Sequence, residues 1–128
     1  MILSRRPARI SWVQLAGLLT IVLDFGVSFW VELAKNGHWF WQHDKILHTI
    51  AGIGIATAFL LYARRSGEVV IAVLFLGIVW EILETFFVPL IEYGGLGWYL
   101  LDTAGDLVAE IIGAFLILWF IKKLNARQ

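Results

Sequence analysis

The chain has 128 residues, of which 60% are hydrophobic and only 16% are charged, and its formal net charge is zero. A soluble domain of this length could not bury so much apolar surface, so the composition indicates a single membrane domain that covers residues 1–128. The balanced charge offers no basic surface for nucleic acid, and the lack of cysteine excludes disulfides and thiolate zinc sites.

Four apolar segments follow one another along the chain, at residues 10–33, 46–63, 69–88 and 102–121. Each is close to the ~20 residues that a helix needs to cross a bilayer. The basic residues before the first segment are typical of a signal peptide, but the apolar run is longer than a signal peptide has, and we expect a retained first span. Gly and Pro punctuate the short connections. The sequence therefore predicts an all-α membrane protein, an antiparallel bundle of four transmembrane helices.

The basic residues predict the orientation of these spans. Eight of the ten lie on one side of the membrane, namely Arg5, Arg6, Arg9, Arg64, Arg65, Lys122, Lys123 and Arg127. Only Lys35 and Lys45 lie on the other side. Because cytoplasmic loops carry the excess of Lys and Arg, we expect both termini to be cytoplasmic.

Every predicted span also carries ionisable side chains, which cost roughly 2.5–3.5 kcal/mol each near the bilayer centre. Their spacing of three or four residues puts them on one face of each helix. In chain order they are Asp24 and Glu32, Asp44 and His48, Glu81 and Glu84, and finally Asp102, Asp106 and Glu110. Intramembrane ionisable residues usually have a function, so these residues form the candidate site.

The depth of these residues predicts what they bind. Counting inward from the outer boundary at about 1.5 Å per residue puts one group in a single layer, namely Asp24, His48, Glu81, Glu84 and Asp106, with Glu110 somewhat deeper. Carboxylates crowded together in low dielectric take up protons or bind a cation. We therefore predict a divalent metal ion, zinc, manganese, magnesium or iron. Its predicted ligands are His48, Glu81, Glu84 and Asp106, and the second-tier candidates are Asp24, Asp44, Asp102 and Glu110.

Simpler roles compete with this hypothesis. Asp44 and Asp102 each stand where a predicted span begins, and a helix N-cap is the favoured interpretation for both. For Asp24 and Glu32, the alternative is a solvated position at the membrane interface. For His48, the alternative is a buried histidine that hydrogen-bonds to a carboxylate. Small residues allow helices to pack closely, and we expect that role for Gly52, Gly54 and Gly113.

Three motifs in the second, third and fourth spans carry a family resemblance. They are Asp44-Lys45-Ile46-Leu47-His48, Trp80-Glu81-Ile82-Leu83-Glu84, and Asp102-Thr103-Ala104-Gly105-Asp106 with Gly113. From about residue 44 to 118 the chain resembles the VanZ-like membrane proteins and, more closely, the YjdF-like family of bacterial membrane proteins. VanZ-like proteins tend to have Glu-x-x-Gln and a later Asn where this chain has Glu84 and Glu110, so its site is more acidic. The resemblance implies a cell-envelope role in the bacterial inner membrane and supplies no established activity.

The leading hypothesis is a metal-dependent enzyme that hydrolyses a lipid-linked phosphate at the outer leaflet. The ion would hold phosphate oxygens and activate water, with Glu84 or His48 as general base and membrane lipid as partner. Arginine is lacking at this level, which leaves Lys35 and Lys45 to hold a phosphate. One alternative is a transporter or channel for protons or divalent cations, although the inner half of the spans lacks ionisable residues. Another is a structural or lipid-binding subunit, and self-association into a homo-oligomer stays open.

Overall fold

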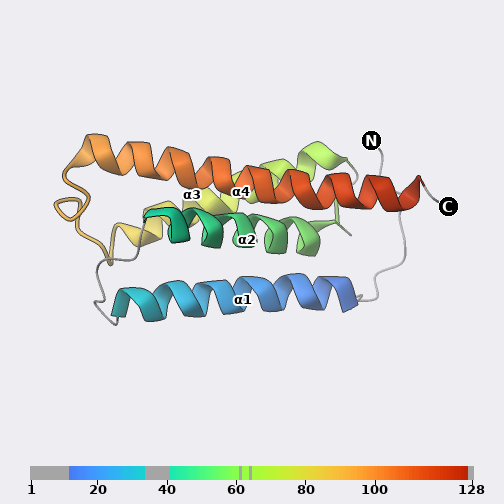
Figure 1. The fold of residues 1–128 in the computed structure, drawn as a ribbon, viewed down its shortest axis with the longest axis horizontal. Helices are drawn as coiled ribbons and strands as arrows, with labels where there is room; N and C mark the ends of the chain where they lie inside the picture. Colours follow the sequence, from blue (N-terminus) through green and yellow to red (C-terminus); the bar gives the residue numbers. More distant parts are fainter. Residues whose placement is uncertain (1–11, 34–40, 61, 64, 127–128) are drawn as a thin grey trace.

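The computed structural model describes the backbone of residues 12–33, 41–60, 62–63 and 65–126, and side chains for all of these except 13, 24, 25, 28–33 and 41–43. The described part forms four helices and contains no strand. The helices are α1 (Trp12–Leu33), α2 (Trp41–Phe59), α3 (Ser66–Glu84) and α4 (Leu96–Asn125). Figure 1 shows consecutive helices running in opposite directions along the long axis of the molecule. The predicted all-α, antiparallel arrangement of four helices is confirmed.

Two helices begin earlier than the predicted spans. Helix α2 begins at Trp41 and α4 begins at Leu96, which are five and six residues before the predicted starts at 46 and 102. Hydropathy marks the residues that suit hydrocarbon, whereas a helix continues through polar residues as long as its backbone hydrogen bonds continue. Asp44 therefore lies within the first turn of α2, and Asp102 lies in the second turn of α4. The N-cap interpretation is wrong for both residues.

The connection between α3 and α4 is built from turns. Helix α3 ends at Glu84, before the predicted end at 88, and residues 85–95 follow with local backbone hydrogen bonds such as that from the Gly95 amide to the Leu90 carbonyl. Gly94 and Gly95 have φ angles of +83° and +111°, which residues with a side chain rarely adopt. These two glycines allow the chain to reverse direction before α4 begins.

Helix α2 lies at the centre of the bundle and packs against α4, α1 and α3. At its crossing with α4, a Cβ atom on Gly52 would collide with the Glu110 carbonyl, and one on Gly113 would collide with the Thr49 carbonyl. A Cβ atom on Gly54 would lie 3.2 Å from the carbonyl oxygen of Gly17 on α1, which is a tight contact. The expectation that Gly52, Gly54 and Gly113 allow close helix packing is confirmed. In the described part, the backbone of α1 approaches α2 alone.

Apolar side chains fill one half of the bundle and cover its outside. The core cluster consists of Ile55, Ala56, Val69, Val73, Ala114 and Leu118. Large apolar side chains such as Phe75, Ile82, Phe115 and Trp119 point outward and are exposed. Soluble proteins rarely expose so much contiguous apolar surface, so this surface suits lipid. Helices α3 and α4 are long and apolar enough to cross a membrane, and the spans predicted for α1 and α2 stay predictions.

The orientation can be tested with single cysteines, because the natural chain has none. Ile91→Cys lies in the exposed turn before α4, and Tyr62→Cys lies in the exposed connection between α2 and α3. We expect an impermeant maleimide added to intact cells to label the cysteine at 91 and to spare the one at 62. Permeabilised cells serve as the control, in which both should react. Labelling at 62 in intact cells would reverse the predicted orientation.

Candidate metal centre

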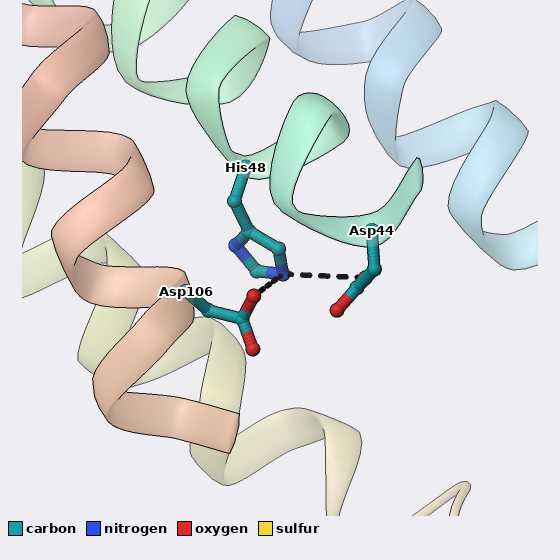
Figure 2. Close-up of side chains that lie close together, drawn as sticks. All are labelled: Asp44, His48 and Asp106. Carbon is teal, nitrogen blue, oxygen red and sulfur yellow. Dashed lines mark ion pairs between the residues drawn. The ribbon is translucent and has the colours of Figure 1, made fainter. Parts of the chain in front are cut away.

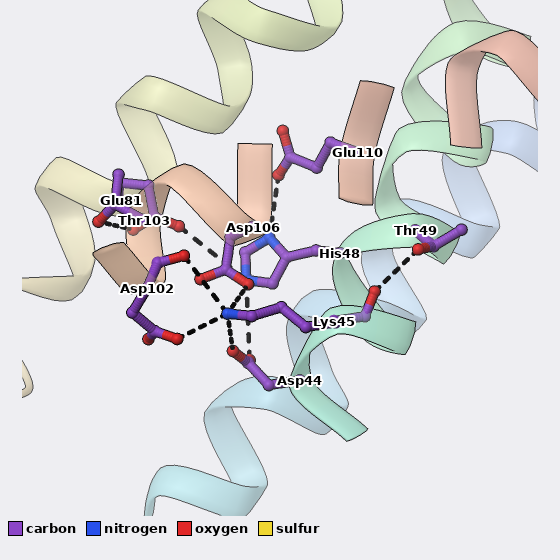
Figure 3. Close-up of polar contacts among 9 residues, drawn as sticks. All are labelled: Asp44, Lys45, His48, Thr49, Glu81, Asp102, Thr103, Asp106 and Glu110. Atoms are coloured by element: carbon purple, nitrogen blue, oxygen red, sulfur yellow. Dashed lines mark hydrogen bonds and ion pairs between the residues drawn. The ribbon is translucent and has the colours of Figure 1, made fainter. Parts of the chain in front are cut away.

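Polar side chains from three helices meet at one end of the bundle, where α2 and α4 begin and α3 ends. Figure 3 shows them pointing toward one another between the helices. Helix α2 contributes Asp44, Lys45 and His48, helix α3 contributes Glu81, and helix α4 contributes Asp102, Thr103, Asp106 and Glu110. The i, i+4 spacing within α2 and within α4 puts each set on one face of its helix.

Lys45 is the counter-charge inside this cluster. Its Nζ atom lies 2.6 Å from Asp102 Oδ1, 2.5 Å from Asp106 Oδ1 and 3.3 Å from Asp44 Oδ2. The aliphatic part of Lys45 passes over Gly105, where a Cβ atom would lie 3.1 Å from Lys45 Cε. The two aspartates of the Asp102–Asp106 motif thus bind the ammonium group, and the glycine between them leaves room for the lysine to reach it.

His48 is buried at the centre of the carboxylates. Its Nδ1 atom lies 3.1 Å from Glu110 Oε1. Its other nitrogen, Nε2, lies 3.6 Å from Asp106 Oδ1, 3.7 Å from Asp44 Oδ1 and 4.0 Å from Glu81 Oε1. An ionised carboxylate only accepts hydrogen bonds, so the Glu110 contact favours the proton on Nδ1. Nε2 then faces three carboxylate oxygens that come from three different helices.

Two buried carboxylate oxygens have no hydrogen-bond partner among the described residues, and they are Glu81 Oε1 and Glu110 Oε2. Both side chains are held by their other oxygen, because the Thr103 hydroxyl donates to Glu81 Oε2 at 2.7 Å and His48 contacts Glu110 Oε1. Glu110 Oε2 lies against Gly77 of α3, where a Cβ atom would collide with it. An unpaired buried oxygen costs free energy, so these two atoms mark places for a ligand.

Asp44, His48 and Asp106 have the ligand atoms to hold a metal ion. One atom from each residue lies within 4.8 Å of the other two, and His48 and Asp106 are buried while Asp44 is half-exposed. Figure 2 shows the imidazole ring between the two carboxylates. Zinc ligands lie about 2.0–2.2 Å from the ion, which puts neighbouring ligand atoms about 3.3–3.6 Å apart. The distances of 3.6 and 3.7 Å from Nε2 are close to that range.

The chain matches a family model over residues 12–127, which includes every residue of this cluster. The family is described as "Predicted membrane protein (DUF2238)". The chain belongs to the DUF2238 family. A search of curated proteins and a search of solved structures gave no match.

The predicted ligands of this DUF2238 protein do not all meet. His48, Glu81 and Asp106 lie together, as their predicted depth requires. Glu84 lies one helical turn beyond Glu81, where its carboxylate pairs with Tyr93 and interacts with the described residues of the cluster only through longer-range electrostatics. Tyr93 belongs to the turns after α3, and burial together with the Glu84 carboxylate raises the pKa of its hydroxyl well above the ordinary value. The hydroxyl therefore keeps its proton and donates to Glu84.

The second-tier candidates have different outcomes in this DUF2238 protein. Asp44, Asp102 and Glu110 are all members of the cluster, and Glu110 contacts His48 despite its deeper position. The backbone of Asp24 and Glu32 belongs to α1, and their side chains lie outside the described residues. The sequence suggested Lys45 only as a cation that could hold a phosphate, and it suggested no role for Gly77. The contacts that both residues make depend on other helices.

Proposed function

We propose that this membrane protein binds one divalent cation through Asp44, His48 and Asp106, with Glu81 as the fourth ligand. The observation that supports this set is the ring of oxygens around His48 Nε2, each within 4.0 Å of it. Glu81 joins the set because its Oε1 atom is buried there without a partner. One imidazole and three carboxylates suit zinc, manganese or iron, and oxygen-rich sites also take magnesium.

Glu110 and Lys45 support the ligands from outside this set. A metal-bound histidine usually donates its second ring N–H to a carboxylate, which fixes its tautomer and its orientation. Glu110 Oε1 stands in that position, 3.1 Å from His48 Nδ1. Lys45 holds Asp106 and Asp44 by hydrogen bonds, and a carboxylate has enough lone pairs to accept these and bind an ion as well.

Charge supports a cation as well. The cluster contains five carboxylates, Asp44, Glu81, Asp102, Asp106 and Glu110, against Lys45 and at most one positive charge on His48. Even with both bases charged, the carboxylates remain in excess. A divalent cation would balance most of this excess and would give the unpaired Glu81 oxygen a partner.

For the chemistry, we propose hydrolysis of a phosphate monoester carried by a membrane lipid. A water oxygen forms a bond to phosphorus, the bond from phosphorus to the lipid oxygen breaks, and the lipid alcohol leaves with a proton. A bound divalent cation stabilises the charge on the phosphate oxygens and lowers the pKa of water. The Asp44 side chain is 45% exposed and gives the substrate a route in. Glu84, one turn closer to this end, is the proposed general base, since both nitrogens of His48 are engaged.

A transporter or channel receives less support. Below the cluster, the bundle is closed by the buried apolar residues Ile55, Ala56, Val69, Val73, Ala114 and Leu118. The buried polar side chains at that level, Gln14 and Thr57, bond to backbone carbonyls of α2. No ionisable side chain of the described residues continues through this layer, as a path for protons or cations would require. The proposal also has the site facing the outside of the bacterial inner membrane. It gives the protein a role in the cell envelope, as the resemblance to the VanZ-like and YjdF-like proteins implies.

Metal analysis of the purified protein tests the proposal. We expect about one zinc, manganese, iron or magnesium ion per chain, and we expect His48→Gln to lose it because the only nitrogen ligand is gone. A chelator should lower the melting temperature of the wild-type protein, since bound metal stabilises only the folded state.

Glu84→Gln is the matched control, because Glu84 lies on the same helix as Glu81 but pairs with Tyr93. It should keep both the metal and the sensitivity to chelator. Wild-type protein without stoichiometric metal would contradict the proposal. Loss of metal from Glu84→Gln would instead return Glu84 to the ligand set that the sequence predicts.

A further inference from the structure

A cavity of about 190 Å³ lies beside the cluster and has almost entirely apolar walls. Its polar members are His48 and Glu110, and its apolar walls come from Ile21, Leu47, Ala51, Ile55, Leu76, Val79, Trp80 and Leu83. The cavity is somewhat larger than the ~150 Å³ apolar cavity that stays dry and accepts benzene. It therefore has room for a segment of about six carbons.

The cavity is elongated along the helices. On α2 its lining residues follow one face, Leu47, Ala51 and Ile55, and this face spans about 12 Å at 1.5 Å per residue. The polar members lie at the level of the metal centre, and Ile55 belongs to the apolar core. Residues of α1 and α3 both line the cavity, and in the described part the backbones of these two helices do not approach each other. We place the entry of a lipid chain between these two helices.

The polar end of the cavity is lined by Glu110, which has an unpaired carboxylate oxygen. Glu110 is 3% exposed, and its Oε2 atom has no hydrogen-bond partner in the described part of the chain. Its other oxygen is already engaged by His48. A carboxylate oxygen only accepts hydrogen bonds, so a ligand that satisfies it must bring a hydroxyl or an N–H group. The ligand thus combines a hydrocarbon chain with a donor close to the chain's polar end.

We propose that the cavity binds the acyl chain of a monoacyl glycerol phosphate, whose free glycerol hydroxyl donates to Glu110 Oε2. The placement of its phosphate at the cluster rests on the proposed function, whereas the placement of the chain and the hydroxyl rests on the cavity. The cavity has room for one chain. A diacyl glycerol phosphate has esterified the hydroxyl in question and cannot make the hydrogen bond. A polyprenyl phosphate has no hydroxyl at this position.

Binding of four lipids to the full-length protein in detergent tests this inference, with native mass spectrometry as the readout. The lipids are an oleoyl glycerol phosphate, its analogue without the free hydroxyl, the dioleoyl form and a polyprenyl phosphate. A hydrogen bond to a charged acceptor is among the stronger ones, so loss of the hydroxyl should weaken binding about tenfold or more. Equal affinity for the first two lipids, or tighter binding of the polyprenyl phosphate, would overturn the inference.

A matched pair of variants tests the cavity itself. Ala51→Leu puts three more carbons into the cavity and should weaken binding of the oleoyl glycerol phosphate strongly, whereas Ala16→Leu makes the same change on the exposed face of α1. Metal content is measured on the same samples. If metal is present and Ala51→Leu binds the lipid as wild type does, the inference fails and the proposed function stands. If metal is absent but the protein still prefers the oleoyl glycerol phosphate over the other three lipids, the inference stands and the proposed function fails.

Discussion

Lys45→Met is expected to lower the free energy of unfolding by about 3–5 kcal/mol, because removal of one partner leaves buried charge uncompensated. Asp106 is 2% exposed, and without Lys45 its one remaining side-chain contact within the described part of the chain is the more distant one with His48. Asp102 loses its ion pair altogether among the described residues. Thermal unfolding of the purified protein in detergent, followed by circular dichroism, measures the effect.

Two further variants separate charge from packing at this position. Lys45→Arg keeps the positive charge and should retain more stability than Lys45→Met, although its larger head group must fit over Gly105. The double variant Lys45→Met with Asp102→Asn removes one of the uncompensated charges and should regain part of the loss. A Lys45→Met protein that melts like wild type would show that Lys45 does not stabilise the cluster.

Asp44→Asn is expected to abolish release of phosphate from a lipid phosphate, whereas Asp102→Asn should retain most of it. Both aspartates contact Lys45, but only Asp44 also faces His48 Nε2, at 3.7 Å. Loss of a residue that hydrogen-bonds directly to a metal ligand already costs about 10–100-fold, whereas the Asp102 side chain contacts Lys45 and, among the described residues, no ligand. Loss of a ligand should cost more than that. Because the Asp44 side chain is half-exposed, we expect the Asp44→Asn variant to fold.

The assay measures phosphate release from monoacyl glycerol phosphate in detergent with added zinc, manganese or magnesium. Metal content and melting temperature of both variants accompany it, so that a loss of folding is not mistaken for a loss of chemistry. Equal activity of Asp44→Asn and Asp102→Asn would remove Asp44 from the metal centre. If wild-type protein releases no phosphate while proteoliposomes show a metal or proton flux, the transporter alternative replaces the enzyme.

The sequence predicts the number and direction of the helices well, because hydropathy and loop length depend on neighbouring residues in the chain. It also predicts that His48, Glu81 and Asp106 share one level along the bundle, since that level follows from the rise of each helix. Prediction from the sequence fails where the role of a residue depends on contacts with another helix. Lys45 has its partners on α4, and Gly77 is small because Glu110 needs the space.

Glu84 shows the limit of spacing arguments within one helix. Residues three apart share a face only approximately, since successive side chains are about 100° apart and three steps leave a rotation of about 60°. Glu81 turns toward His48, whereas Glu84 meets Tyr93 from the turns after α3. The course of those turns depends on Gly94 and Gly95, and the helical periodicity of the sequence does not predict it.

The long sequence separation of the Lys45 ion pairs affects how the protein enters the membrane. The partners of Lys45 on α4 lie 57 and 61 residues further along the chain, so they are synthesised long after α2. In the described part only α3 and α4 have the length and hydropathy of a spanning helix, and each charge in α2 opposes its insertion alone. Helix α2 is therefore expected to reach its final depth only when α4 arrives. If synthesis stops before residue 102, α2 lacks these partners, and we expect the proteases of membrane quality control to degrade such a chain.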